Sequence, residues 1–191
     1  MDVSALFRIL YLAWIFSEVA VLLITRTRSS NTNADVQDRG SLRVLWLVIV
    51  FTVTLGSYYG ETHAHNIDPT TSWARTTALT ILIIGLAIRW TAIFTLGRSF
   101  SANVAIHATQ TVHKTGLFRF VRHPSYSGLV LIFAAVGLHT RNWLGLAIIF
   151  VPTTAALFYR IKVEESALRR AFGAEYDDYC KSTKCLIPGI Y

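Results

Sequence analysis

The chain has 191 residues, of which 53% are apolar and only 15% are charged, and its formal net charge is +7. This composition is too apolar for an ordinary soluble domain of this length and indicates a membrane protein. Basic proteins often bind nucleic acid, but the sequence contains no recognisable nucleic-acid-binding module, so we do not expect nucleic acid as a partner.

Five apolar runs follow one another along the chain. The runs 3–25, 44–59 and 76–96 are each near the roughly 17 to 25 residues that a helix needs to cross a bilayer. The runs 126–138 and 143–159 are shorter and closely spaced, so they are expected to form a tight hairpin that either crosses with bilayer thinning or is partly re-entrant. The first run lacks the basic leader and cleavage site of a signal peptide, so we expect it to be retained.

Lysine and arginine are distributed unevenly. If five helices cross, residues 26–43, 97–122 and 160–191 share one face, and these segments hold four, four and six of the 18 basic residues. The positive-inside rule makes this face cytoplasmic, with the N-terminus outside and the C-terminus inside. The surplus of positive charge would also attract anionic membrane lipid.

Polar and aromatic side chains are concentrated in residues 116–126, which read GLFRFVRHPSY between apolar segments. Pro124 has no N–H and disfavours a helical conformation at His123, so a helix is expected to begin near Ser125. His123, Ser125, Tyr126 and free backbone donors could then converge on a polar ligand at this helix entrance. The alternative is that the stretch is only a polar boundary at the membrane surface.

Two segments flank this stretch. Residues 96–113 alternate polar and β-branched side chains, which suggests a short extended excursion. After the last apolar run, Leu168, Phe172, Tyr176 and Tyr179 recur at helical spacing. This pattern predicts an amphipathic cytoplasmic helix, interrupted at Gly173, that can pack over the site as a lid.

Ionisable residues within the predicted spans are functional candidates, and there are two deep ones, Glu18 and Arg89. Glu18 could be catalytic, or it could be neutral or hydrogen-bonded to a neighbouring helix. Arg89 lies roughly 10 Å from the cytoplasmic end of its helix, where it could snorkel to the interface or line a substrate cavity.

Two groups of possible metal ligands are weak candidates. The polar loop at 60–72 contains His63, His65 and Asp68 but is expected on the opposite face from the polar stretch, and Cys180 and Cys185 match no common zinc spacing. We therefore expect no metal site, and no disulfide on the cytoplasmic side.

Several motifs together resemble the isoprenylcysteine carboxyl methyltransferase family of integral membrane enzymes. They are residues 122–128 (RHPSYSG), the apolar hairpin, Arg160, Glu164-Glu165 and Phe172-Gly173-x-x-Tyr176. The resemblance covers residues 96–188, whereas the first two helices match only as hydrophobic spans. It implies an enzyme that binds S-adenosylmethionine on the cytoplasmic side and methylates the carboxylate of a prenylated cysteine or a similar amphiphilic acid that enters from the bilayer.

The resemblance also implies which residues form the site. Arg160 would contact the substrate carboxylate, and the alternative is that it is an ordinary cytoplasmic anchor residue. The implied cofactor-binding residues are Gln110, Thr111, Val112, His113, Phe118, His123, Pro124, Ser125, Tyr126 and Glu164, with Asn103 a weaker candidate. Two positions depart from the family pattern, because Phe118 stands where tyrosine is common and His113 stands where an aliphatic residue is usual.

The chemistry of the residues agrees with this assignment. Glu164 and Glu165 would favour a positively charged sulfonium, and a carboxylate nucleophile is already ionised at neutral pH, so no general base is required. Three alternatives are a phospholipid N-methyltransferase, which would need a base, a membrane reductase of sterol-reductase-like type, which would bind a nicotinamide cofactor, and a non-enzymatic membrane scaffold.

The expected fold is all-α and polytopic, with about five transmembrane helices, the last two a short hairpin, and a cytoplasmic C-terminal helix. We expect residues 1–191 to form a single integral membrane domain. Within it, residues 1–60 form two N-terminal spanning helices and residues 74–191 form the catalytic part.

Overall fold

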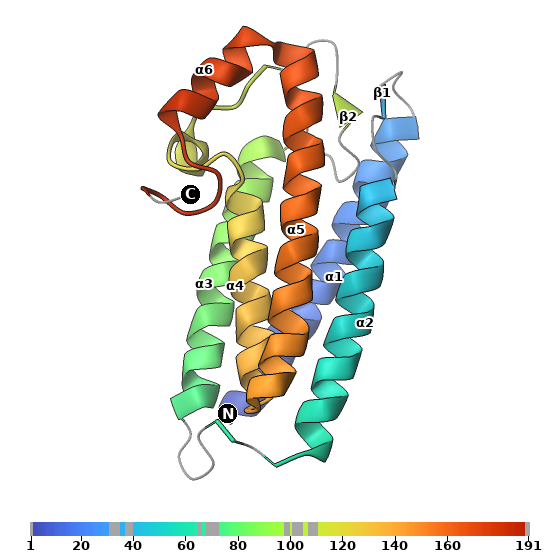
Figure 1. Ribbon diagram of the computed structural model, residues 1–191, viewed down its shortest axis with the longest axis vertical. Helices are drawn as coiled ribbons and strands as arrows, with labels where there is room; N and C mark the ends of the chain where they lie inside the picture. Colours follow the sequence, from blue (N-terminus) through green and yellow to red (C-terminus); the bar gives the residue numbers. More distant parts are fainter. Residues whose placement is uncertain are drawn as a thin grey trace.

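The computed structural model describes residues 2–30, 35–36, 40–64, 66–67, 73–97, 100, 105–106 and 111–189. These residues form the helices α1 (Val3–Ser30), α2 (Gly40–Thr62), α3 (Trp73–Leu96), α4 (Pro124–His139), α5 (Trp143–Phe172) and α6 (Ala174–Ser182). A 3-10 helix, η2 (Gly116–Arg119), and two short strands, β1 (Asp35–Val36) and β2 (Ala105–Ile106), complete the described elements. Figure 1 shows α1 to α5 running between the two ends of an elongated bundle, with β1, β2 and α6 gathered at one end.

The fold is helical, as expected, apart from the antiparallel pair of β1 and β2. Within the described residues, four helices are long and apolar enough to cross a membrane, namely α1, α2, α3 and α5. The hairpin of α4 and α5 is also present, and Asn142 caps the start of α5 by accepting from the backbone N–H groups of Leu144 and Gly145.

The second arm of the hairpin is longer than its apolar run. The apolar run at 143–159 and the polar segment after it form one helix of 30 residues, α5. The chain has no glycine or proline between Pro152 and Gly173, so nothing ends the helix earlier. At Gly173 the backbone φ is 53°, a conformation that favours glycine, and α6 turns back from there. The predicted interruption at Gly173 is therefore confirmed.

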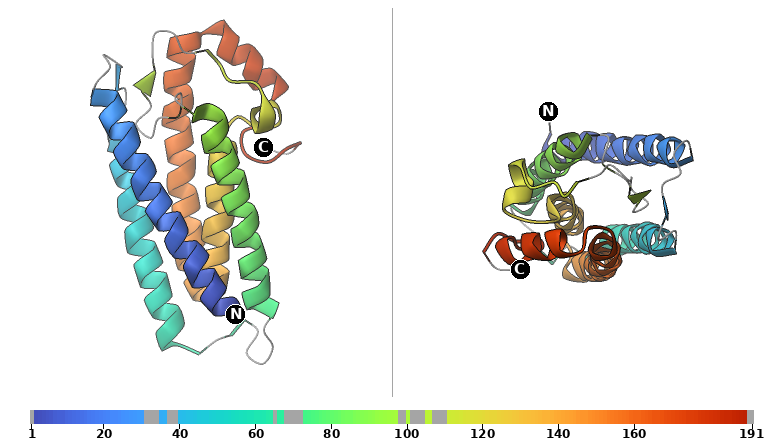
Figure 2. Two further views of the ribbon diagram at one scale, coloured as in Figure 1. Left: turned by 180° about the vertical axis from the view of Figure 1, so that it is seen from behind. Right: turned by 90° about the horizontal axis from the view of Figure 1, so that it is seen from above.

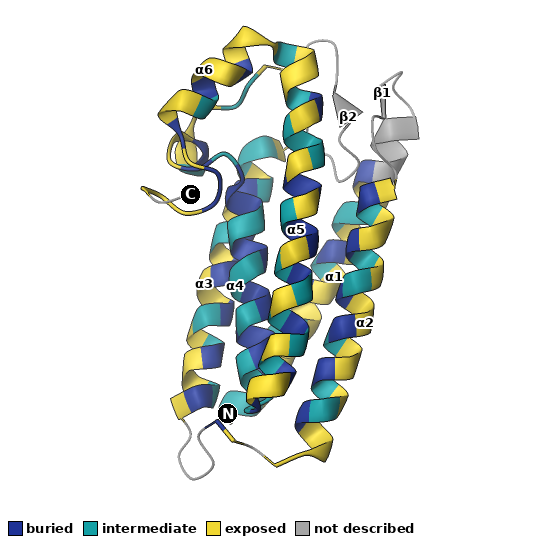
Figure 3. Ribbon diagram, in the orientation of Figure 1, coloured by how far each residue is buried: buried dark blue, intermediate teal, exposed yellow. Residues whose placement is uncertain are grey.

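The helix α4 is the centre of the bundle. It packs against α3 and α5, while α2 packs against α5 and α1 packs against α3. Figure 3 shows α4 mostly in the colours of buried and intermediate residues, and Figure 2 shows α1 beside α3 on one side and α2 beside α5 on the other. Large apolar side chains on the outer faces of α1 and α2, such as Phe16 and Leu47, are exposed, as expected for surfaces that meet lipid.

Two glycines bring α3 and α4 into backbone contact. A Cβ atom on Gly128 would lie 2.7 Å from the carbonyl oxygen of Gly85 and 2.8 Å from the backbone nitrogen of Arg89. No real side chain fits at that distance, so this crossing requires glycine. The close approach fixes the start of α4 against the part of α3 that carries Arg89.

The C-terminal segment after α6 is held against the start of α4. The backbone N–H groups of Arg122 and His123 donate to the carbonyl oxygens of Lys184 and Cys185 over 2.8 and 3.1 Å. The hydroxyl of Ser127 donates to the Leu186 carbonyl over 2.6 Å. Residues 184–186 therefore behave as an added strand-like segment that closes one side of the polar end of the bundle.

Candidate functional site

The start of α4 organises the site. Pro124 occupies the first turn of the helix and His123 is the residue before it, as the sequence predicts to within one residue. His123 and Ser125 are both buried, with 5% and 8% of their surfaces exposed. The end of the polar stretch is thus enclosed within the protein, whereas Arg119 and Phe120 before it are exposed, and the enclosed part argues against a simple boundary at the membrane surface.

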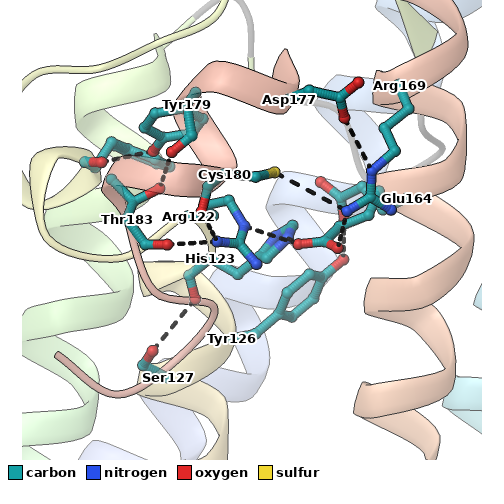
Figure 4. A network of polar contacts seen from close by, with 12 residues as sticks. Arg122, His123, Tyr126, Ser127, Glu164, Arg169, Asp177, Tyr179, Cys180 and Thr183 are labelled. Carbon is teal, nitrogen blue, oxygen red and sulfur yellow. Dashed lines mark hydrogen bonds and ion pairs between the residues drawn. The ribbon is translucent and has the colours of Figure 1, made fainter. Parts of the chain in front are cut away.

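Figure 4 shows Arg122, His123 and Arg169 near one another. Glu165 contacts all three and joins them into one cluster. Its Oε1 accepts from Arg122 Nε over 2.9 Å and lies 3.3 Å from His123 Nε2, and its Oε2 accepts from Arg169 Nη2 over 3.3 Å. Burial opposes the charge on Arg122, but the hydrogen bond and charge of Glu165 outweigh it, so the pKa of this guanidinium is raised. Arg122 also donates to the carbonyl oxygens of Thr183 and Cys180, and thereby ties this cluster to the C-terminal segment.

His123, Glu165 and Cys185 present metal-ligating atoms within 4.8 Å of one another. A divalent cation there would meet the guanidinium of Arg122, which already occupies Glu165 Oε1. Burial, with the nearby charge of Glu165, also raises the pKa of the Cys185 thiol to about 11, so the thiol is protonated at neutral pH. These contacts describe an ion-pair cluster, and the donor set does not fit a metal ion.

Glu164 points to a different neighbour. Its Oε2 accepts from the hydroxyl of Tyr126 over 2.7 Å, and both side chains line a cavity at the polar end of the bundle. The roof of this cavity comes from the residues predicted to form a lid, and the prediction is confirmed in that Leu168, Phe172, Tyr176 and Tyr179 all line it. Tyr179 is anchored there because its hydroxyl donates to the Phe118 carbonyl oxygen over 2.5 Å.

The cavity continues from this polar end into the membrane-spanning part of the bundle. Its deeper lining consists of large apolar side chains from α1, α2 and α4, namely Val21, Leu22, Leu45, Ile49 and Leu129. One wall is charged, because Glu18 and Arg89 also line the cavity. Arg89 therefore faces the cavity and does not snorkel to the interface, which resolves the two alternatives that the sequence left open.

The structure brings together most of the predicted cofactor-binding residues. Those that line the cavity are Thr111, Val112, His113, Phe118, His123, Ser125, Tyr126 and Glu164. Pro124 is buried in the first turn of α4 and supports them, whereas Gln110 and Asn103 lie outside the described residues. Their roles in cofactor binding stay predictions.

The two departures from the family pattern are neighbours. The rings of His113 and Phe118 meet edge to face, with centroids 5.4 Å apart. The two positions at which the resemblance implies a departure therefore share a single contact, where an edge-to-face pair is favourable. This contact gives the two departures one shared physical reason.

Arg160 is placed differently from the cavity residues. Its side chain is almost fully buried, with 1% of its surface exposed, and its Nη1 donates to the hydroxyl of Ser41 on α2. Its charge lies close to the hydroxyl of Tyr126, but Arg160 is not among the residues that line the cavity. The structure thus puts Arg160 behind Tyr126 and against α2.

Sequence reasoning missed several contributions to the site. Trp14, Leu42 and Trp46 of the first two helices line the cavity, and Arg122 joins both the cavity and the Glu165 cluster. Trp14 and Glu18 are four residues apart on one helix, so their shared face could have been read from the sequence. No local signal identifies which other helix that face meets.

The chain is similar to known proteins over part of its length. Residues 78–170 match the sequence profile of the isoprenylcysteine carboxyl methyltransferase (ICMT) family. The chain is 34% identical over 115 residues to a probable protein-S-isoprenylcysteine O-methyltransferase of Oryza sativa subsp. indica, and 33% identical over 122 residues to protein-S-isoprenylcysteine O-methyltransferase B of Arabidopsis thaliana. These matches cover 59% and 62% of this chain and 60% and 61% of the relatives, so the chain spans about 60% of the length of these relatives.

A solved structure extends the similarity to almost the whole chain. The structure of a eukaryotic intramembrane Ras methyltransferase, an isoprenylcysteine carboxyl methyltransferase, superposes with a TM-score of 0.66 over 96% of this chain and 65% of that chain. At 23% sequence identity this match shows a shared fold. The two N-terminal helices, which matched only as hydrophobic spans in the sequence, are part of that shared fold.

Proposed function

Because the chain belongs to the isoprenylcysteine carboxyl methyltransferase family, we propose that it is an S-adenosylmethionine-dependent methyltransferase that esterifies the carboxylate of a prenylated cysteine or a similar amphiphilic acid. The observation that carries this proposal is the continuity of the cavity, which joins the polar side chains of His123, Tyr126 and Glu164 to apolar side chains of α1 and α2. An acceptor with a carboxylate and a long apolar chain matches both ends of such a cavity.

The polar end fits S-adenosylmethionine, which would supply a methyl group on a positively charged sulfur. Glu164 offers a carboxylate to that positive charge, and the rings of Phe118 and Tyr126 offer apolar surface to the adenine. The residues proposed to hold the cofactor are the predicted set from 110–113, with Phe118, His123 to Tyr126, and Glu164. The roof formed by α6 and the end of α5 would exclude water.

The acceptor carboxylate is ionised at neutral pH, so the residues around it need only orient it. We propose Arg160 for that role, because a guanidinium can hold both oxygens of a carboxylate at once. To do so, Arg160 would exchange its hydrogen bond to Ser41 for one to the acceptor. Tyr126 lies between Arg160 and Glu164 and would hold these two charged side chains in fixed positions relative to each other.

For the membrane, we propose five crossings with the α6 end in the cytoplasm. The helix α4 has 16 residues, or about 24 Å at 1.5 Å per residue, which is short of the roughly 30 Å of a bilayer core. Because α3 and α5 enclose it, its ends are covered by protein. The acceptor would reach the cavity from the bilayer, while the cofactor would enter from the cytoplasmic end.

The test is methyl transfer by the purified protein. With S-adenosylmethionine carrying a labelled methyl group and N-acetyl-farnesylcysteine as acceptor, we expect label in a base-labile methyl ester. Isothermal titration with S-adenosylhomocysteine should show binding without an acceptor. Label in lipid head-group amines would instead identify a phospholipid N-methyltransferase, and the absence of binding to either cofactor form would overturn the proposal.

A further inference from the structure

A bidentate ion pair is buried between α1 and α3 at the depth of the cavity. Arg89 Nε donates to Glu18 Oε1 and Arg89 Nη2 donates to Glu18 Oε2, each over 2.6 Å. Trp14 Nε1 donates to Glu18 Oε1 over 2.9 Å. Glu18 and Arg89 expose only 5% and 6% of their surfaces, so both charges are held inside the protein.

A contribution to folding stability does not by itself explain why this ion pair is present. Burying two charges costs several kcal/mol per ion, and apolar replacements of a buried pair are often neutral or stabilising. The same two helices are already joined by a hydrogen bond between neutral side chains, in which the indole N–H of Trp90 donates to the hydroxyl of Ser17 over 3.2 Å. Ionisable groups kept within a membrane span are functional candidates for this reason.

The pair is directly connected to the site. Arg89 Nη1 donates to the hydroxyl of Ser125 over 2.5 Å and approaches the Ser125 carbonyl oxygen at 3.4 Å. Ser125 is in the first turn of α4, beside Tyr126, which in turn donates to Glu164. A chain of polar contacts therefore runs from Glu18 through Arg89 to the residues proposed to hold the cofactor and acceptor.

The hydrogen bonds of Arg89 to described residues do not use all of its N–H groups. A guanidinium carries five N–H groups. Among the residues that the structure describes, its hydrogen bonds engage Nε, one N–H of Nη2 and the two N–H groups of Nη1. One Nη2 N–H is left, on a side chain that lines the cavity.

The charges are also balanced for two oppositely charged ligands. Arg89 is paired with Glu18 and Arg122 is paired with Glu165, and a cationic methyl donor and an anionic acceptor would together add no net charge to this region of low dielectric. Arg89 approaches the first turn of α4 from α3, and Arg160 approaches it from α5. A carboxylate placed between them would meet a cation on either side.

We propose that Arg89 binds the acceptor carboxylate at the wall of the cavity, and that Glu18 is a positioning residue that holds the Arg89 guanidinium in the orientation required. The inference rests on the proposed function, because it assigns the acceptor subsite of that reaction. In this role Glu18 acts through Arg89, because its bidentate contact holds the guanidinium in place beside Ser125. Arg89 then recognises the negative charge of the acceptor inside the bundle, in addition to the recognition of its apolar chain by the cavity.

The test compares Glu18→Gln, Arg89→Gln and the double variant Glu18→Gln/Arg89→Gln in the full chain. The double variant removes both charges, so it avoids an unpaired buried charge and should fold even if a single variant does not. We expect its KM for N-acetyl-farnesylcysteine to rise by about tenfold or more, the range for a lost hydrogen bond to a charged group. Its affinity for S-adenosylhomocysteine should stay within about twofold.

Trp90→Phe is the matched control. It removes a hydrogen bond between the same two helices, from the residue next to Arg89, and Trp90 is not among the residues that line the cavity. Its KM should be unchanged. If the ion pair were only a tie between helices, the neutral double variant would regain the wild-type KM, and that result would overturn the inference.

A second measurement separates this inference from the proposed function, because it needs no turnover. Binding of N-acetyl-farnesylcysteine is compared with binding of its uncharged carboxamide. The wild-type protein should prefer the acid, and the double variant should lose that preference. Equal preference for the acid in both proteins overturns the role of Arg89, whereas a wild-type protein that binds the acid but transfers no methyl group contradicts the proposed function alone.

Discussion

Glu164 and Glu165 are consecutive residues, yet their carboxylates contact different partners. Successive residues on a helix point about 100° apart, so the two side chains face different neighbours. Glu165 holds Arg122, His123 and Arg169 together, whereas Glu164 accepts from Tyr126 at the cavity. The two carboxylates look equivalent in the sequence. In the structure, Glu165 holds together the side chains beside the cavity, whereas Glu164 lines the cavity itself.

Glu164→Gln should weaken cofactor binding without unfolding the protein. The amide oxygen can still accept from Tyr126, so the variant loses charge and little else. We expect about 1 to 3 kcal/mol less binding energy for S-adenosylmethionine, and a smaller loss for S-adenosylhomocysteine, which lacks the sulfonium charge. Isothermal titration with both ligands checks this. Glu175→Gln, at a half-exposed carboxylate paired with Lys114, is the control and should bind normally. Equal affinity in the Glu164 variant would remove this residue from the cofactor site.

Arg160→Lys tests the proposed grip on the acceptor. Lysine keeps the positive charge but lacks the planar fork of the guanidinium. Turnover of N-acetyl-farnesylcysteine should therefore fall by about tenfold or more, while S-adenosylhomocysteine affinity stays nearly constant. Lys162→Arg, two residues along the same helix and exposed, is the control. Near-normal turnover in Arg160→Lys would leave Arg160 with a structural role against Ser41, and a parallel loss of cofactor affinity would move it into the cofactor site.

At the scale of helices, the sequence predicts each element where a local signal exists. Pro124 sets the start of α4, Gly173 sets the end of α5, and long apolar runs identify α1, α2 and α3. The neighbours of each helix are not local information. An apolar face can meet lipid or protein equally well, so nothing in the run at 3–25 reveals that Trp14 and Glu18 reach α3 and the cavity. The closure of the site by Thr183 to Leu186 is also non-local, because it depends on carbonyl oxygens that every residue has.

Gly128→Ala should separate α3 from α4 at the site. The added Cβ would approach the Gly85 carbonyl and the Arg89 backbone to less than 3 Å, so one backbone must move. We expect a loss of about 1 to 3 kcal/mol in stability, as for other overpacked contacts, together with weaker acceptor binding because Arg89 shifts from Ser125. Thermal unfolding in detergent and the KM for the acceptor check both effects. Ala87→Ser on the exposed side of α3 should change neither, and wild-type values in Gly128→Ala would show that the crossing tolerates a side chain.

Arg122→Lys should release the C-terminal segment. Arg122 uses Nε for Glu165 and Nη1 for the Thr183 and Cys180 carbonyls, and a lysine ammonium cannot span these positions. Amide hydrogen exchange should become faster at residues 183–187, while exchange in α2, which lies on the far side of α5, stays slow. Lys181→Arg, at an exposed residue paired with Asp178, provides a comparison in the same region. Unchanged exchange in Arg122→Lys would mean that the backbone contacts of Arg122 and His123 hold the segment alone.

Across the whole molecule, the elements that close the cavity lie at one end. The strands β1 and β2 join the α1–α2 connection to the segment before η2, and α6 and the C-terminal segment lie at the same end (Figure 1). At the opposite end, the chain turns from α2 to α3 and from α4 to α5. The proposed cofactor from aqueous solution and the proposed acceptor from lipid would then approach one cavity from two directions, so the proposed function depends on the orientation of the bundle in the membrane.

The two native cysteines can report that orientation. Both lie at the α6 end, where Cys180 is partly exposed and Cys185 is buried. The thiolate is the reactive form, and because burial and the charge of Glu165 raise the pKa of Cys185 to about 11, that thiol should react slowly at pH 7. If the α6 end is cytoplasmic, a membrane-impermeant maleimide should leave intact cells unlabelled and should modify Cys180 once the cells are permeabilised. Cys185→Ser should keep this labelling and Cys180→Ser should lose it, which assigns the reacting thiol. Labelling of intact cells would place the proposed cofactor site outside the cell, on the side that lacks S-adenosylmethionine, and would contradict the five-crossing arrangement.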